Sequence, residues 1–157
     1  MKKIQYLIFV LLVFYACNNK VQDDRIIGIW QLAPVMGAGW TESFAFFENG
    51  EVIYRINQTI CDERRIGYEA QYEYKNDTLY IKKTRDIRIE GGKLVDAKGS
   101  CSSDKEIVGG KIVKKETEHS IFKYKVSPIH KNKAFGKLSM KIGDKTYYKH
   151  RDNPVDY

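Results

Sequence analysis

Apolar and polar residues alternate along most of the chain after its first 25 residues, and this period of two predicts β-strands. No apolar run at helical spacing follows that point, and glycines fall mostly between the alternating runs. Tyrosine and phenylalanine, which favour strands, are frequent, with 11 Tyr and 7 Phe. The pattern therefore predicts an all-β fold, with strands at residues 26–33, 41–48, 51–56, 68–75, 78–83, 111–115, 120–126, 137–142 and 145–150.

The pair Asn49-Gly50 predicts a hairpin whose register follows from the buried face. A two-residue turn would mix apolar and polar residues on each face, with Phe46 opposite Ile53. A type I turn with a glycine bulge instead pairs Phe46 with Val52. We expect the second register, because it places one apolar set on one face: Phe44, Phe46, Val52, Tyr54 and Ile56.

A second hairpin is expected around Asn76-Asp77, where a tight two-residue turn gives a consistent pattern. This turn sets Tyr74 opposite Leu79 and Tyr72 opposite Ile81, all facing inward. Residues 84–110 break the rhythm and are rich in glycine. They predict an insertion with a small hairpin around Gly91-Gly92. The total of eight to ten strands suffices to close an antiparallel up-and-down barrel and remove exposed edges.

The first 16 residues have the character of an export signal rather than of a fold element. Two lysines precede a largely apolar stretch of 13 residues, from Ile4 to Ala16, which is too short for a membrane span. Ordinary signal peptidase would have to accept Phe14 where a small residue is preferred. The segment instead resembles a bacterial lipobox, in which a small residue precedes a cysteine. The resemblance implies cleavage after residue 16 and acylation of Cys17, although Phe14 and Tyr15 depart from the motif.

Acylation would place the protein in the bacterial cell envelope, held in the membrane through Cys17. Asn18 stands where aspartate is the usual inner-membrane retention residue, so the outer membrane is favoured, on its periplasmic or surface face. Residues 17–25 read as a polar tether and residues 152–157 as a tail. Removal of the signal lowers the formal charge from +7 to +5, and an exported chain would not meet nucleic acid. The 141 remaining residues suit one domain, predicted at 26–151.

Three sequence features together resemble the bacterial lipocalin-like lipoproteins. They are Gly28-Ile29-Trp30, the segment from Phe44 to Val52, and the segment from Tyr72 to Ile81. The resemblance implies an up-and-down barrel with a cavity. It also implies that Trp30 plugs the closed end under an arginine, for which Arg151 is placed. A cation–π contact of that kind contributes roughly 0.5–2 kcal/mol. The alternative is that Trp30 is an ordinary core residue and Arg151 a solvated one.

In such a meander successive loops alternate between the two ends, so the loop at 57–65 and the insertion share one end. Cys61 and Cys101 lie in these segments, and after Cys17 they are the remaining cysteines of a chain in an oxidising compartment. We therefore expect a disulfide between Cys61 and Cys101. The apolar loop at 34–40 lies at the same end and contributes Met36 and Trp40 to a ligand entrance, unless both merely cap the barrel.

We expect Tyr54, Tyr72, Tyr74 and Tyr124 to supply polar groups for a ligand inside the barrel, unless large aromatic side chains fill the interior. The three histidines lack metal-ligand spacing, and no phosphate loop, nucleophile elbow or dinucleotide motif is present, so we expect no cofactor, metal site or enzyme activity. The leading functional hypothesis is a lipid-anchored barrel that binds a small apolar or amphipathic ligand. The alternative is an envelope protein-interaction module that uses the loops and the insertion.

Overall fold

The computed structural model describes residues 24–37 and 40–154, which form one antiparallel sheet of ten strands. The all-β fold class is confirmed, and the one helix in the described part of the chain is a short 3-10 turn, η1 (Asp24–Ile26). The predicted signal, Cys17 and most of the tether lie outside the described residues. The strands are β1 (Gly28–Gln31), β2 (Ser43–Phe46), β3 (Glu51–Arg55), β4 (Arg65–Lys75), β5 (Thr78–Asp96), β6 (Lys105–Glu116), β7 (Ile121–Lys125), β8 (His130–Lys131), β9 (Leu138–Ile142) and β10 (Lys145–Arg151).

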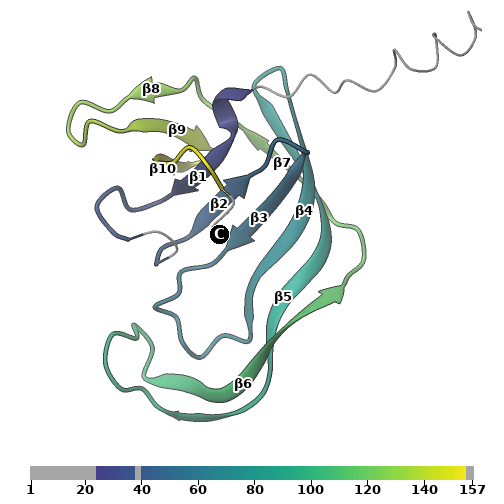
Figure 1. Cartoon of the computed structure of the whole chain (residues 1–157), viewed down its shortest axis with the longest axis vertical. Coiled ribbons are helices and arrows are strands. Elements are labelled where there is room, and N and C mark those ends of the chain that lie inside the picture. The colour runs from purple at the N-terminus through teal and green to yellow at the C-terminus, as the bar shows by residue number, and fades with distance from the viewer. Residues whose placement is uncertain (1–23, 38–39, 155–157) are drawn as a thin grey trace, which may run out of the picture.

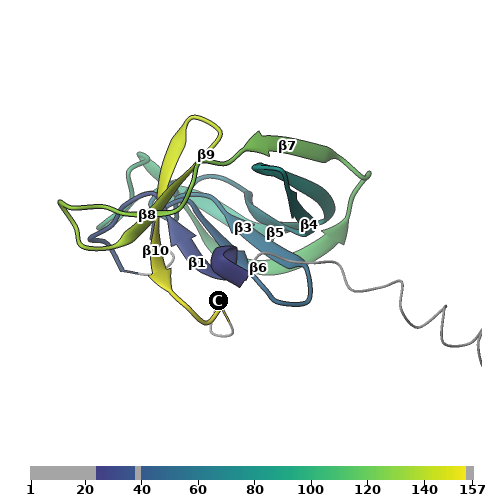
Figure 2. The same cartoon turned by 90° about the horizontal axis from the view of Figure 1, so that it is seen from above.

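The sheet curls strongly but does not close (Figure 1, Figure 2). Its order is β6-β5-β4-β3-β2-β1-β10-β9-β8, and β7 pairs with the first part of β5. Between β7 and β9 the ladder is reduced to one isolated bridge, Val126 to Ile142. The Lys125 and Lys141 carbonyls also accept bonds from the Gly143 and Ser127 amides, at 2.8 and 3.0 Å. An antiparallel sheet is thus established, whereas a continuous barrel is not.

Both predicted hairpin registers are confirmed. Phe46 pairs with Val52 and Phe44 with Tyr54, and Gly50 adopts a φ of 84°, as a glycine bulge requires. Asn76 and Asp77 both have positive φ, 51° and 54°, which defines the tight primed turn. That turn sets Tyr74 opposite Leu79 and Tyr72 opposite Ile81, as expected.

The expectation of a small hairpin around Gly91-Gly92 is wrong. Strand β5 runs through both glycines, and Gly91 pairs with Gly110 of β6. Residues 84–110 therefore extend β5 and β6 into one long hairpin, whose turn comes at residues 97–104. A glycine pair in sequence is typical of a turn. Here, however, Gly91-Gly92 of β5 lies opposite Gly109-Gly110 of β6 in the ladder. The result is a bend in a continuous ladder.

The core lies on the concave face of the sheet and is dominated by aromatic side chains. Trp30, Phe46, Val52, Leu79, Ile81 and Met140 have no exposed surface. The Trp30 indole donates to the Ile26 carbonyl at 2.7 Å, which ties η1 to the core. These contacts place Trp30 at the centre of the packing.

The cation over Trp30 is the ammonium of Lys149, 5.8 Å from the ring centroid, where we expected Arg151. A register shift between Ile29 and Trp30 explains the difference, because Arg151 pairs with Ile29 and Lys149 with Trp30. Gly28 lies where β10 approaches β1 closely, since a Cβ there would be 2.4 Å from the Arg151 carbonyl oxygen.

The two ends of the molecule are distinct. In Figure 1, η1 lies toward the upper end and the long β5–β6 hairpin occupies the lower end. Arg25 and Ile26 of η1 and Asp77 of the primed turn line a common hollow. The start of the described chain and the 76–77 turn therefore share one end, and the β5–β6 hairpin lies at the other.

Candidate functional site: an isoleucine-lined groove beside the disulfide

The loop that joins β3 to β4, residues 56–64, lies against the β5–β6 hairpin. At its C-terminal end, just before β4, the loop forms hydrogen bonds with β5. The Ile89 amide donates to the Arg64 carbonyl at 2.7 Å, and the Arg64 guanidinium donates to the Gly91 carbonyl, also at 2.7 Å. These bonds hold the end of the loop at the middle of the hairpin.

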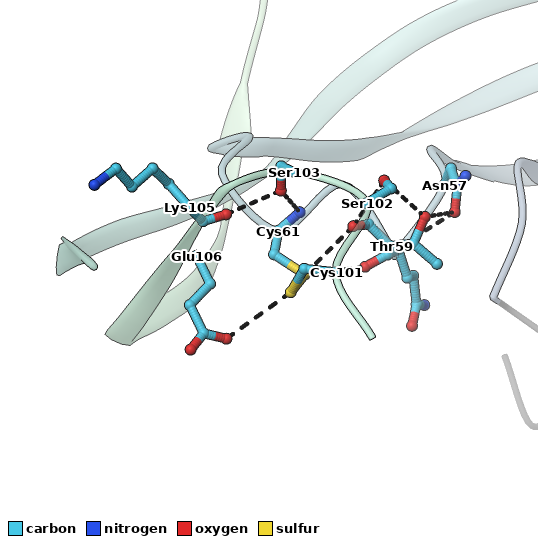
Figure 3. Close-up of a disulfide and its surroundings, with 9 residues drawn as sticks. Asn57, Thr59, Cys61, Cys101, Ser102, Ser103, Lys105 and Glu106 are labelled. Carbon is cyan, nitrogen blue, oxygen red and sulfur yellow. Dashed lines mark hydrogen bonds between the residues drawn. A yellow bond between two sulfur atoms is a disulfide. The ribbon is translucent and has the colours of Figure 1, made fainter. Parts of the chain in front are cut away.

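In its middle, the loop is joined to the hairpin tip by the Cys61–Cys101 disulfide (Figure 3). The predicted bond is therefore present in the structure. Three hydrogen bonds support it. The Ser102 amide donates to the Thr59 carbonyl at 2.7 Å, the Cys61 amide to the Ser103 hydroxyl at 3.0 Å, and the Ile107 amide to the Cys61 carbonyl at 3.0 Å. We call the disulfide and these three bonds the disulfide clamp.

Four glycines allow the hairpin to bend toward this loop. Gly91, Gly92 and Gly109 adopt φ values of 69°, 72° and 74°, a region that favours glycine. Gly110 is required for space instead, because a Cβ there would lie 2.3 Å from Ile89 Cγ2. The absence of side chains at two successive positions of both strands lets the tip fold back, so that Cys101 reaches Cys61.

A groove of about 360 Å³ lies between the loop and the bent hairpin. Clefts of roughly 300–1,000 Å³ with apolar walls and few polar groups are typical of small-molecule sites. Half of the twelve lining residues are isoleucines, and we call the hollow the isoleucine groove. The apolar residues are Ile56, Ile60, Ile66, Ile89, Ile107 and Ile112; the others are Arg55, Asn57, Gln58, Cys61, Glu63 and Glu106.

Two other hollows have a different character. One of about 200 Å³ lies at the η1 end and is smaller than most ligand sites. One of about 560 Å³ lies beside the C-terminal segment, and its lining mixes Ile27, Phe47 and Pro154 with Glu48, Asn49, Asp152 and Asn153. The isoleucine groove differs from both in its six isoleucines and in its position between the two segments that the disulfide joins.

A tyrosine cluster adjoins the groove along β3 and β4. Tyr54 and Ile56 are alternate residues of one segment, as are Ile66 and Tyr68 of another. The rings of Tyr54 and Tyr68 stack at 4.8 Å between centroids, Tyr68 and Phe122 lie 5.8 Å apart, and Phe122 and Tyr124 lie 6.4 Å apart. Near-parallel, offset rings at such distances attract one another beyond their burial.

The carboxylate of Glu42 is the polar centre of this cluster. It accepts a hydrogen bond from the Tyr147 hydroxyl and forms an ion pair with Lys145 at 2.6 Å. Burial raises the pKa of Tyr54, Tyr68, Tyr124 and Tyr147, and the charge of Glu42 raises each of them further. These phenols are therefore neutral hydrogen-bond donors at physiological pH.

The tyrosine cluster predicts a loss of stability at alkaline pH. Because the phenol pKa values in the folded chain lie above the value of about 10 in the unfolded chain, the stabilisation is complete below pH 10 and is lost as the pH rises above it. Urea unfolding followed from pH 8 to about pH 11 should show this decline. Tyr68→Phe should reduce its slope, whereas Tyr80→Phe, at an exposed position on β5, should not. An unchanged slope in Tyr68→Phe would contradict this assignment.

The structure separates the six predicted ligand residues into three places. Tyr54 and Tyr124 belong to the tyrosine cluster. Tyr72 and Tyr74 use their hydroxyls near the β2–β3 and 76–77 turns, on the Phe47 carbonyl at 3.0 Å and on Asp77 at 3.2 Å. Met36 and Trp40 are about half exposed on the β1–β2 loop.

The isoleucines of the groove were not predicted from the sequence. Ile56, Ile60 and Ile66 flank or occupy a loop, and Ile89, Ile107 and Ile112 lie in the segment treated as an insertion or beside it. No local signal in the sequence marks them, because they come together only when the two segments lie against each other.

Within residues 24–37 and 40–154 no group of three or more His, Cys, Asp or Glu side chains is arranged to hold a metal ion. The described part of the chain also has no helix with the length and apolar character of a membrane span. Comparison of the chain with protein-family models, with curated proteins and with solved structures finds no match.

Proposed function

We propose that the protein is an envelope lipoprotein, anchored through acylated Cys17, that binds a small apolar or amphipathic ligand in the isoleucine groove. The observation that carries the proposal is the groove itself, with six isoleucines around about 360 Å³ at the end of the molecule opposite η1. An anchor before η1 would leave this end directed away from the membrane. Binding, with no chemical step, is the proposed activity.

The ligand's apolar part would contact the isoleucines, and its polar part the polar residues of the groove. Burial of apolar surface contributes about 25 cal/mol per Å², so even a short aliphatic chain gains several kcal/mol before the cost of ordering. Arg55, Asn57, Gln58, Glu63 and Glu106 line the same groove and supply both hydrogen-bond donors and acceptors. The mixture suits an amphipathic molecule better than a pure hydrocarbon.

We propose further that the sheet is a lipocalin-like barrel in which the β7–β9 seam is incomplete. The Gly143 and Ser127 amide bonds across the seam support this relation, as does the position of Trp30 at the core. The difference from a simple cavity barrel is that Trp30, Phe46 and Met140 fill the interior close to η1. The ligand is therefore assigned to the groove and not to that part of the interior.

A charged substitution in the groove tests the proposal. Ile112 lines the groove and is 66 % exposed, so Ile112→Glu should fold normally yet weaken ligand binding at least tenfold by placing a carboxylate beside the apolar chain. Ile121→Glu is the matched control, because Ile121 is 71 % exposed on β7 and does not line the groove. Binding is measured by displacement of anilinonaphthalene sulfonate with dodecanoic acid. Equal affinity in both variants would place the ligand elsewhere.

Native mass spectrometry identifies the physiological ligand class. The chain from residue 18 onward, purified from its own bacterium, should carry a small molecule that is released on denaturation. The Ile112→Glu variant purified in the same way should carry less of it. A bare mass for the wild-type chain would count against the binding proposal.

A second candidate function is a protein-interaction module of the envelope. The ordered β5–β6 hairpin favours it, because the hairpin projects from the sheet and exposes Leu94 and Val108, each more than half accessible. A protein partner that covered these side chains would remove their apolar surface from water. This candidate predicts a bare mass in the native spectrum together with a protein partner whose capture is lost in Leu94→Ser.

A further inference from the structure

The β8–β9 segment, away from the β5–β6 hairpin, carries charged side chains of positive sign only. Residues 127–143, which contain β8 and β9, include four lysines and no aspartate or glutamate. None of the four forms an ion pair with another described residue, whereas Lys105, Lys114 and Lys115 of the β5–β6 hairpin all do. The lysines of residues 127–143 are Lys131, Lys133, Lys137 and Lys141.

Exposed apolar side chains stand among these lysines. Phe135 at the β8–β9 turn is 47 % exposed and Leu138 is 41 % exposed. The Lys137 ammonium donates to the Pro34 carbonyl and so ties this turn to the β1–β2 loop, where Val35 is 80 % exposed. We call these residues the basic face: Val35, Lys131, Lys133, Phe135 and Leu138.

Part of this face is held in a fixed position by the sheet. Phe135 packs edge-on against Tyr148 of β10, with 5.5 Å between the ring centroids. The Asn132 side chain accepts hydrogen bonds from the Ala134 and Phe135 amides, at 3.0 and 3.2 Å, which orders the turn. The apolar ring is therefore presented by a structured turn.

The segment that leads into β8 lies beside the start of the described chain. Pro128 and Ile129, just before β8, share a hollow with Arg25 and Ile26 of η1. Figure 1 shows β8 and β9 at the upper end of the view and the tip of the β5–β6 hairpin at the lower end. Cys17 precedes Asp24 by seven residues, a span of at most about 25 Å. A chain anchored at Cys17 would keep the start of β8 within reach of the lipid surface.

We infer that the basic face docks onto a membrane surface that contains anionic lipids. Lysines near such a surface attract its head groups, and half-exposed aromatic and aliphatic side chains enter the boundary between head groups and acyl chains. The inference goes beyond ligand binding, since it rests on charge and exposure at a different place in the fold. The anchor adds proximity, but the attraction does not depend on it.

Vesicle binding by the anchor-free chain tests this inference. The chain from residue 18 onward keeps every described contact, since these all lie within residues 24–154. It should co-sediment with vesicles of roughly 60:40 phosphatidylcholine to phosphatidylglycerol and much less with pure phosphatidylcholine. Lys131→Gln with Lys133→Gln should weaken the partition constant about 25-fold, or about fivefold per lysine. Phe135→Ser should weaken it as well, and about 0.5 M salt should suppress it.

Two controls distinguish a specific face from general positive charge. Lys98→Gln with Lys111→Gln removes the same charge from the β5–β6 hairpin and should leave partition nearly unchanged. Equal loss in that variant would overturn the inference, as would equal binding to both kinds of vesicle. If the chain binds heparin through Lys131 and Lys133 but ignores anionic vesicles, the face recognises an acidic polysaccharide and the lipid assignment is wrong. The vesicle experiment does not involve the isoleucine groove. A negative result therefore leaves the ligand-binding proposal unaffected.

Discussion

Replacement of Trp30 by alanine should lower the free energy of unfolding by about 3–5 kcal/mol, the largest effect expected of any single substitution here. Trp30 has no exposed surface, and its indole donates to the Ile26 carbonyl at 2.7 Å. The substitution removes the whole ring from a packed core and leaves that carbonyl without its donor. Urea unfolding at neutral pH measures the change.

Two further variants separate the contributions to this value. Lys149→Met keeps the aliphatic stem and removes the cation over the ring, so it should cost about 1 kcal/mol or less. The loss of stability in Trp30→Phe should lie between the losses in Lys149→Met and Trp30→Ala, because phenylalanine keeps much of the apolar surface. A Trp30→Ala variant that remains within about 1 kcal/mol of wild type would show that Trp30 is not central to the core.

Removal of the disulfide by Cys61→Ser with Cys101→Ser should lower stability by about 2–4 kcal/mol. The two cysteines are 40 residues apart, so reduction frees a long loop in the unfolded chain. The loss should not exceed this range, since the Thr59, Cys61 and Ser103 hydrogen bonds of the disulfide clamp remain possible in the folded chain. Urea unfolding again provides the measurement.

The same double variant should also bind the fluorescent probe more weakly, because the clamp holds one wall of the isoleucine groove against the other. Addition of a reductant to the wild-type chain should reproduce both effects and serves as the control. A double variant with unchanged stability and unchanged probe affinity would contradict the role given to the clamp.

The two predicted hairpins show what the sequence specifies well. Asn49-Gly50 and Asn76-Asp77 each lie between alternating runs, and the requirement for one buried face leaves one register in each case. The disulfide could be predicted for a similar reason, because loop parity places Cys61 and Cys101 at one end. Local turn chemistry and a period of two carry this information.

The features that were missed depend on contacts between distant segments. The register shift between Ile29 and Trp30 decides that Lys149, rather than Arg151, lies over the ring, and nothing in either segment alone reveals it. The glycine pair at 91–92 reads as a turn until its pairing with residues 109–110 is known. The groove brings together isoleucines that are up to 56 positions apart, from Ile56 to Ile112, so no local pattern marks it.

Nuclear magnetic resonance of the isoleucine methyl groups tests the central claim most directly, because every isoleucine reports its own surroundings. Dodecanoic acid should shift the methyl signals of the groove residues, Ile56, Ile60, Ile66, Ile89, Ile107 and Ile112. The signals of Ile53, Ile121 and Ile142 should stay in place. Shifts confined to the second set, or no shifts at saturating ligand, would contradict the assignment of the isoleucine groove as the ligand site.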